Sequence, residues 1–313
     1  MGKELVIIAG PTASGKSAVS VALAGKAGGE IISADSMQVY KNMDIGSAKI
    51  TPGEMKGVAH HLIDILEPAE EFNVSVFCAR ASAAVEEIKK RGHLPVICGG
   101  TGFYIRAFLY GIDFAEGETD PTVRQRLEEK AREAGTERME EELKSFDPVS
   151  AGVYHGNLKR IIRALEYHEL TGRLMSEKNA EERARRAVYD AAFFVLTMPR
   201  EMLYERIDKR VDLMMEAGLT DEVRRLREMG VTRDMTSMQG LGYRQIYDHI
   251  EGRYDLQTAV DEIKKQTRHF AKRQLTWFRR EKGVIWVDVS LFDSPDAIAD
   301  HCISIIRDSG GIS

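Results

Sequence analysis

The chain has 313 residues, 43% hydrophobic and 30% charged, with a net charge of -5 at neutral pH. This length allows one large domain with an insertion, or two domains. The charge excludes a general attraction to polyanions, so contact with nucleic acid must come from a local basic patch. Cys78, Cys98 and Cys302 are too few and too widely spaced for a disulfide framework or a CxxC zinc site. With no apolar run near the roughly 18 residues of a membrane span, a cytoplasmic protein is expected.

Short apolar runs alternate with helical patterns in the first third of the chain. The expected strands are residues 5–9, 30–33, 61–65 and 94–98, and the expected helices are residues 17–26, 73–90 and 102–109. Such alternation is typical of a parallel sheet with crossover helices.

The pattern changes at about residue 111. Residues 120–144 carry dense mixed charge and begin with Asp120-Pro121, a helix start, and further helix is expected at 157–170. We interpret residues 114–190 as a helical insertion into an α/β core of residues 1–113 and 191–313. After the insertion we expect strands at 191–198 and 284–289, helices at 199–215, 221–229 and 257–281, and a closing helix to residue 307.

The segment GPTASGKS, residues 10–17, joins the first strand to the first helix. Glycine, four residues and then Gly-Lys-Ser form the phosphate-binding loop pattern, in which backbone N–H groups and a helix N-terminus hold an anion. In such loops Lys16 would reach the terminal phosphate and Ser17 would coordinate Mg²⁺. The pattern names a ligand group, not a reaction. A dinucleotide-binding GxGxxG is excluded because Thr12 stands where the second glycine is needed.

Two further candidates follow strands of the predicted sheet, at the edge that faces the ligand in open α/β folds. Asp35, in SADSMQVY, is a general base, a metal ligand, or merely a turn or capping residue. Thr101, in GGTGFY, stands where an ATPase often has an acidic residue, although Asp64 can supply that carboxylate instead. His60 and His61 with Asp64 resemble a metal cluster, but adjacent residues of a strand point to opposite faces.

Arg206 and Arg210 lie four residues apart on a predicted helix and share one face. Two guanidinium groups so placed can clamp a diphosphate. The alternative is ion pairing with the neighbouring acids Glu205, Asp208 or Asp212.

A basic island lies in this acidic chain, because residues 264–282 contain eight Lys or Arg residues and one acid. Aromatic residues such as Trp277 interleave with the charges, which suits stacking on unpaired bases as well as burial in a core. Ion pairing with the acidic insertion is the alternative. A second basic element carries Lys159 and Arg163 four residues apart. Two basic elements around a phosphate site favour a nucleic acid as substrate.

These motifs together resemble the bacterial tRNA dimethylallyltransferase family, also called tRNA isopentenyltransferases. The resemblance runs nearly end to end, through GPTASGKS, DSMQVYKNMDIGSAK, HHLIDI, GGTGFY, KRIIRALE, LYERIDKRVDLMMEAGLTDEV, QGLGYRQ and AKRQLTWFR. It implies a P-loop-type parallel sheet flanked by helices, with an all-helical insertion that grips the anticodon stem-loop. It also implies Mg²⁺ and transfer of a dimethylallyl group from dimethylallyl diphosphate to N6 of adenosine 37 in tRNA. We expect a monomer, and the loop need not bind ATP although its pattern is often labelled so.

The family's functional positions map onto this sequence by motif. The implied diphosphate-binding residues are Gly10, Pro11, Thr12, Ala13, Ser14, Gly15, Lys16 and Ser17, with Ser17 also holding Mg²⁺. The implied catalytic residues are Asp35 as general base, Lys16, Thr101 and Arg210. The implied tRNA-binding residues are Asp35, Ser36, Met37, Gln38, Thr101, Lys159, Arg160, Ile161, Ile162, Arg163, Gln239, Gly242, Tyr243, Arg244, Lys272, Arg273, Gln274, Trp277 and Arg279. Met37 departs from the Arg of many members, Ser47 from a common Thr, and Lys159 from the usual Gln.

Two other functions fit parts of the sequence. A P-loop kinase of a small metabolite, with Asp35 as base, explains the first 110 residues equally well but leaves the basic aromatic helix without a purpose. A non-enzymatic, RNA-binding ATPase switch would make Asp35 dispensable for binding. RNA-independent ATP turnover identifies the kinase, and ATP-dependent RNA affinity identifies the switch.

Overall fold

The computed structural model describes residues 3–112 and 119–308. The chain divides into a larger unit, residues 1–109 with 189–313, and a smaller unit, residues 110–188. The sequence analysis placed these borders at 113/114 and 190/191. Within the described ranges, no helix is both long and apolar enough to cross a membrane.

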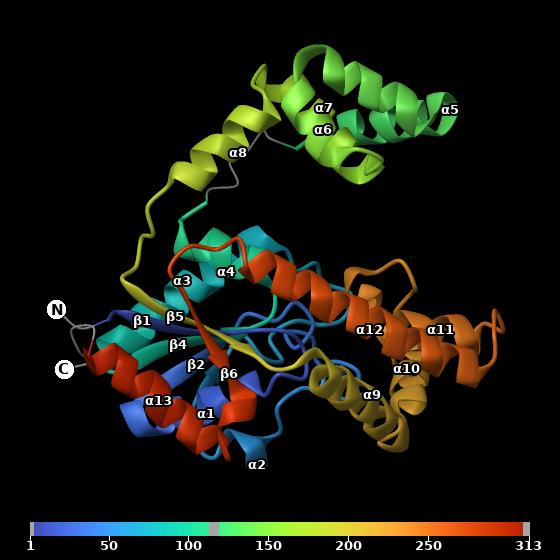
Figure 1. The fold of residues 1–313 in the computed structure, drawn as a ribbon. Coiled ribbons are helices and arrows are strands. Elements are labelled where there is room, and N and C mark those ends of the chain that lie inside the picture. The colour runs from blue at the N-terminus through green and yellow to red at the C-terminus, as the bar shows by residue number, and fades with distance from the viewer. Residues whose placement is uncertain (1–2, 113–118, 309–313) are drawn as a thin grey trace. The chain divides into compact units, whose positions relative to one another are not determined.

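The larger unit is built on a six-stranded sheet with the order β3-β2-β4-β1-β5-β6 (Figure 1). Its strands are β1 (Leu5–Ala9), β2 (Gly29–Ser33), β3 (His60–His61), β4 (Leu94–Gly99), β5 (Ala191–Thr197) and β6 (Val284–Asp288). Every neighbouring pair is parallel. This confirms the predicted α/β fold with a P-loop-type parallel sheet.

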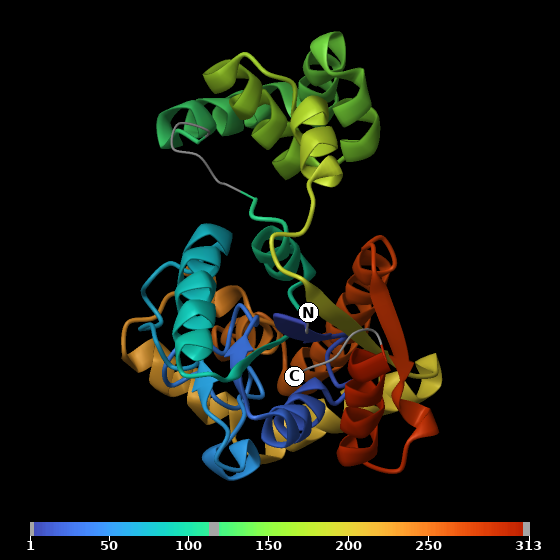
Figure 2. The same cartoon turned by 90° about the vertical axis from the view of Figure 1, so that its left-hand side faces the viewer.

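Helices cover both faces of the sheet (Figures 1 and 2). On one side lie α1 (Lys16–Ala27) and α13 (Pro295–Asp308), which pack together, and on the other lie α3 (Val74–Lys90) and α4 (Gly102–Leu109). The remaining helices of this unit are α2 (Pro52–Met55), α9 (Arg200–Glu216), α10 (Leu219–Glu228), α11 (Tyr243–Ile250) and α12 (Leu256–Phe278), with 3-10 turns at Thr236–Gln239 and Val289–Leu291. Because β1 is buried on both faces, its continuous apolar sequence follows from its central place.

One predicted strand is wrong beyond its first residue. Residues 61–65 do not continue β3, because Leu62 and Asp64 have φ angles of 63° and 54°, in the left-handed region. The chain turns there, and the N–H groups of Asp64 and Ile65 donate to the carbonyl oxygens of Gln38 and Val39. The turn thus holds this segment against the residues that follow Asp35.

The smaller unit contains only helices among its described residues: α5 (Pro121–Phe146), α6 (Pro148–Tyr154), α7 (Leu158–Thr171) and α8 (Met175–Ala184). α5 starts where predicted, because the Asp120 side chain accepts the first N–H groups and Pro121 needs no partner there. Gly135 interrupts α5 with a φ of 80°, so its two halves fold back around one apolar core. α6 was not predicted, although Asp147 before Pro148 was a signal of the same kind.

A buried carboxylate stabilises the edge of the sheet opposite the carboxyl ends of the strands. Glu30 of β2 is 5% exposed and accepts hydrogen bonds from Arg91 Nε and Nη2, at 2.9 and 2.8 Å. The His61 and His93 rings also bond to it, each at 2.7 Å. The Arg91 hydrogen bonds, more than the histidines, lower the pKa of Glu30 to about 2.

We expect Glu30→Gln to lower the midpoint of thermal unfolding by about 5 °C at neutral pH, because the variant removes the charge that Arg91 faces. The carboxylate's contribution is present above its ordinary pKa of 4.5 and is lost as the pH falls toward 2. The difference between the unfolding midpoints of wild type and variant should therefore disappear as the pH falls over that range. Circular-dichroism melts measure both midpoints. A difference that stays constant would show that the charge of Glu30 does not stabilise the fold.

Candidate functional site

Residues 10–17 form a tight loop between β1 and α1. Gly10 has a φ of 147°, and a Cβ there would lie 2.7 Å from the Leu196 carbonyl oxygen, so a side chain does not fit. Gly15, with a φ of 89°, is the N-cap of α1, and Lys16 is the first helical residue. The free N–H groups at this helix end face the loop, which is the arrangement that binds phosphate.

The Lys16 ammonium lies within this loop. Its Nζ donates to the Pro11 carbonyl oxygen at 2.7 Å. Burial lowers the pKa of Lys16 to about 8, and the nearby Arg210 cation acts in the same direction while Asp35 opposes it. A bound anion would relieve both effects, so the loop favours a diphosphate electrostatically.

Helix α9 brings one of the two predicted arginines to the loop. Arg210 Nη1 donates to the Thr12 hydroxyl oxygen at 3.3 Å, whereas Arg206 is exposed. Two of the three acids considered as their partners have other roles, because Asp208 pairs with Arg268 and Asp212 with Lys264 of α12. Arg210 alone therefore fits the predicted contact with a diphosphate.

Asp35 lies just beyond the end of β2, next to the loop. Its Oδ1 accepts the N–H groups of Met37 at 2.8 Å and Gln38 at 3.3 Å, so the turn role considered for it is real. Its Oδ2 has no hydrogen-bond partner among the residues that the structure describes. A pocket with an open volume of about 370 Å³ has Lys16, Ser17, Asp35, Gln38, Ile50 and Ile63 in its wall. The carboxylate thus shares one pocket with the ammonium of the loop.

The loop of residues 43–49 is held over Gln38 by a buried carboxylate from α10. Glu222, 3% exposed, accepts the N–H groups of Asp44, Ile45 and Gly46 at 2.8 to 3.1 Å. The Tyr243 hydroxyl also donates to Glu222, at 2.7 Å. Four hydrogen bonds offset the burial of this charge and fix the loop.

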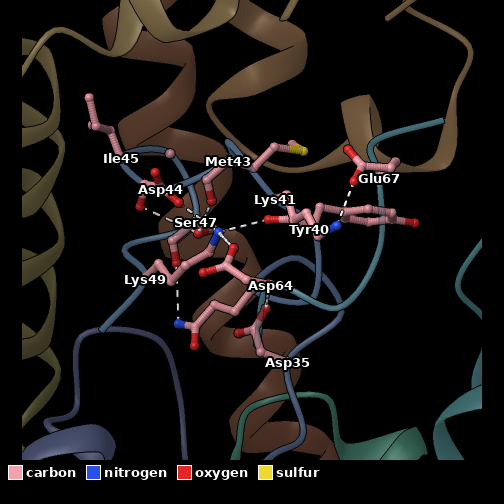
Figure 3. Close-up of polar contacts among 12 residues, drawn as sticks. Asp35, Tyr40, Lys41, Met43, Asp44, Ile45, Ser47, Lys49, Asp64 and Glu67 are labelled. Atoms are coloured by element: carbon pink, nitrogen blue, oxygen red, sulfur yellow. Dashed lines mark hydrogen bonds and ion pairs between the residues drawn. The ribbon is translucent and has the colours of Figure 1, made fainter. Parts of the chain in front are cut away.

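Lys49 ties the same loop to the turn after β3 (Figure 3). Its Nζ donates to the Tyr40 carbonyl oxygen at 2.7 Å and pairs with Asp44 at 2.6 Å and Asp64 at 2.5 Å. Asp64 therefore serves an ion pair and is not in the wall of the pocket. The Gln38 amide completes the link by donating to the Ala48 carbonyl oxygen at 3.3 Å.

Thr101 lies at the same edge of the sheet as Asp35, because Ser33 and Cys98 are partners in the β2–β4 register. Its carbonyl oxygen accepts the N–H groups of Tyr104 and Ile105, which starts α4. Its hydroxyl makes no hydrogen bond within the described ranges, so it is available to a ligand.

Helix α12 changes character along its length. In its first half, Lys264 and Arg268 pair with α9 and Lys265 with Glu262 of the same helix. In its second half and the turn that follows, five exposed cations form no salt bridge in the part of the chain that the structure describes: Lys272, Arg273, Arg279, Arg280 and Lys282. These five unpaired cations form a positive patch, which is the electrostatic footprint of a nucleic-acid site.

Four of the predicted tRNA-binding side chains are buried. Ile161 and Ile162 pack in the core of the smaller unit, Tyr243 binds Glu222, and Gln274 is 6% exposed. The structure therefore gives these four side chains contacts inside the protein. Each of these side chains lies on the face of its helix that packs against the rest of the protein or forms hydrogen bonds with it.

The other predicted contacts are accessible to different degrees. Lys159 and Arg160 are exposed on α7, whereas Arg163 is half-buried and pairs with the buried Glu166 at 3.1 Å. Gln239 is exposed, and Arg244, Ser36 and Met37 are half-buried. Gly242 has a φ of 94° and caps α11.

Sequence reasoning missed Glu222. The signal was present, because Glu222 lies on the face of α10 that also carries the buried Leu219, Val223 and Leu226. A charged residue on the apolar face of a helix must find partners inside the protein.

The parallel sheet, its glycine-rich loop and the cations around that loop define a P-loop-type α/β protein. Family models described as IPP transferase and isopentenyl transferase match residues 38–281 and 3–71. The tRNA dimethylallyltransferase of Lachnoclostridium phytofermentans is 51% identical over 307 residues, which cover 98% of each chain. The chain belongs to the IPP transferase family, and it is a prenyltransferase, which confirms the resemblance in its motifs.

Two solved structures are similar over nearly the whole chain. The full-length tRNA isopentenylpyrophosphate transferase of Bacillus halodurans has a TM-score of 0.73 at 41% identity, covering 99% of this chain and 96% of its own. A eukaryotic dimethylallyltransferase acting on tRNA has a TM-score of 0.82 at 29% identity, covering 99% of this chain and 80% of its own.

We expect the affinity for inorganic pyrophosphate to fall as the pH rises above about 8, where free Lys16 loses its proton. Bound pyrophosphate favours the charged amine, so binding above that pH must take up a proton. Isothermal titration calorimetry in two buffers of different ionisation enthalpy measures this uptake. Lys16→Met should abolish it and weaken binding at least about tenfold, while Lys41→Met, at an exposed ion pair, should change neither. Equal proton uptake by Lys16→Met would remove Lys16 as its source.

Proposed function

We propose that this chain transfers a dimethylallyl group from dimethylallyl diphosphate to N6 of adenosine 37, on the 3′ side of the tRNA anticodon, and releases pyrophosphate. The observation that carries the proposal is the pocket shared by the Asp35 carboxylate and the Lys16 ammonium. A base and a diphosphate site so close together suit an alkyl transfer from a diphosphate. The full-length likeness to tRNA dimethylallyltransferases supports tRNA as the acceptor.

Asp35 is the proposed general base. Adenine N6 is a weak nucleophile because its lone pair is delocalised into the ring, so removing its proton as the N–C bond forms helps the reaction. Two backbone N–H groups hold Oδ1, which fixes the carboxylate and leaves Oδ2 to accept that proton. Thr101, at the neighbouring strand end, is placed to orient the adenosine.

The leaving pyrophosphate gains charge as the allylic C–O bond breaks. The N–H groups of the loop, Lys16 and Arg210 surround the position where that charge develops. Helices α1, α9 and α12 hold these groups in place. No step uses ATP.

Mg²⁺ is proposed to bind mainly through the substrate, as this ion usually binds to a few protein oxygens together with substrate phosphates. No group of three or more His, Cys, Asp or Glu is placed to hold a metal in the described ranges. The exposed Ser17 hydroxyl at the start of α1 is the proposed protein ligand, and the ion would neutralise diphosphate charge.

RNA is proposed to dock on the positive patch of α12, with a second contact at Lys159 and Arg160 of α7. Next to the patch, Phe103 is 40% exposed and meets the Trp277 ring edge-on at 6.2 Å. Such an aromatic pair can stack on an unpaired base, and a base costs least to extrude from a loop. We propose a cytoplasmic enzyme that acts as a monomer, because this one chain supplies every group of the mechanism.

The test is a pair of reactions with Mg²⁺ and an unmodified anticodon stem-loop that has adenosine after the anticodon. One receives dimethylallyl diphosphate and the other ATP, and mass spectrometry reads the nucleosides. We expect prenylated adenosine in the first reaction only. ATP consumption in the second, with no product in the first, would instead support the kinase or the switch.

Asp35→Asn should lower the rate of transfer by about 10²–10⁴-fold, because the amide cannot accept the proton. Binding of the stem-loop should change little, since the amide oxygen still accepts the two N–H groups. Asp190→Asn, at an exposed ion pair, is the matched control and should keep full activity. Single-turnover rates and filter binding give both quantities, and a fully active Asp35→Asn would remove Asp35 from the mechanism.

A further inference from the structure

Gln274, on the basic helix α12, binds two parts of the donor site at once. Its Oε1 accepts the N–H of Thr12 in the phosphate loop at 2.9 Å, and its Nε2 donates to the Gly100 carbonyl oxygen at 2.9 Å. The side chain is only 6% exposed. Because both ends of the amide are satisfied by backbone groups, Gln274 fixes the distance between the loop and the turn after β4.

The glycines of the GGTG turn allow α12 to come this close. A Cβ on Gly100 would lie 2.2 Å from Gln274 Nε2, and a Cβ on Gly102 would lie 2.2 Å from Trp277 Cδ1. A side chain at Gly100 would displace the Gln274 amide, and one at Gly102 would displace the Trp277 ring. Thr101, between them, is therefore positioned by α12 as well as by β4.

Helix α12 also holds the helix that carries Arg210. Arg268 and Lys264 form ion pairs with Asp208 and Asp212 of α9, at 2.5 and 2.6 Å. Arg210, two residues beyond Asp208, reaches the Thr12 hydroxyl. Helix α12 therefore fixes Thr12 in two ways. Gln274 of α12 binds the Thr12 N–H directly, and α9, which α12 holds, brings Arg210 to the Thr12 hydroxyl.

The buried Gln274 and the positive patch belong to one short stretch of one helix. Lys272 and Arg273 precede Gln274 and are exposed, as is Arg279, one turn and a half further on. A ligand on the patch would therefore contact the same turns of helix that hold the loop.

We propose that Gln274 is a positioning residue through which α12 holds the phosphate loop in its binding geometry, so that RNA on the patch and diphosphate in the loop strengthen each other's binding. The idea rests on the proposed function for the identity of the RNA. RNA on the patch limits the motion of α12, so the diphosphate then binds a loop that is already ordered. The coupling must be reciprocal: the diphosphate raises RNA affinity by the same factor.

The variant is Gln274→Leu, which keeps the approximate volume and removes both hydrogen bonds. The matched control is Gln266→Leu on the same helix, where the amide bonds only to Glu262, at 3.3 Å. Calorimetry with Mg²⁺-pyrophosphate, with and without the unmodified stem-loop, measures each affinity and their coupling. We expect the stem-loop to tighten pyrophosphate binding about fivefold or more in wild type and in Gln266→Leu.

In Gln274→Leu we expect pyrophosphate to bind about tenfold more weakly, as for loss of one buried hydrogen bond, and the stem-loop to have less than about a twofold effect on it. The stem-loop alone should bind as to wild type. Unchanged pyrophosphate affinity in Gln274→Leu would overturn the proposal. A loss of stem-loop affinity with the coupling intact would also overturn it, because Gln274 would then be a direct RNA contact.

Gln274→Leu should remain folded in a thermal melt, which separates the loss of the two hydrogen bonds from a general loss of structure. These binding measurements need no chemistry. If wild type shows the coupling and yet forms no prenylated adenosine, the proposed function fails while the role of Gln274 stands.

Discussion

The register of three strands determines where the chemistry can occur. Val96 of β4 is the partner of both Val6 of β1 and Ile31 of β2, so the three strands end nearly level. The segments that follow them carry the phosphate loop, Thr101 and Asp35. A Cβ on Gly99 would lie 2.3 Å from the Ala34 carbonyl oxygen, so β2 and β4 are in close contact where they end. A shift of either strand would separate Asp35 from the phosphate loop.

Charge is the second constraint, and it makes the site depend on its ligand. Lys16 and Arg210 are brought together in a buried place, and burial lowers the pKa of each. The two cations repel each other in the unliganded site, and a bound anion would offset that repulsion. The fold bears this cost through interactions elsewhere, of which the Glu30 cluster and the four hydrogen bonds to Glu222 are examples.

The features that could be predicted from the sequence depend on residues close together in the chain. The phosphate loop, the parallel sheet and the position of Asp35 follow from spacing and periodicity within a few residues, and the structure places them as expected. The turn at Leu62 and Asp64 was missed because its left-handed residues are neither glycine nor asparagine. Glu222 was missed, and the internal contacts of Gln274 were not predicted, because their partners lie 176 to 178 and 262 residues away in the chain. A glutamine in a basic helix is typical of a surface, and only the fold turns it toward the loop.

The two functions proposed for α12 offer an answer to a chemical problem. An allylic diphosphate ionises readily, and in a loop that is always ordered and highly cationic it would be lost to water before an acceptor arrived. If RNA bound on α12 orders the phosphate loop, the loop stabilises the departing pyrophosphate fully only when the RNA acceptor is present. Gln274, bonded to Thr12, is the shortest path between the two sides, since it joins the positive patch to the loop within a single residue.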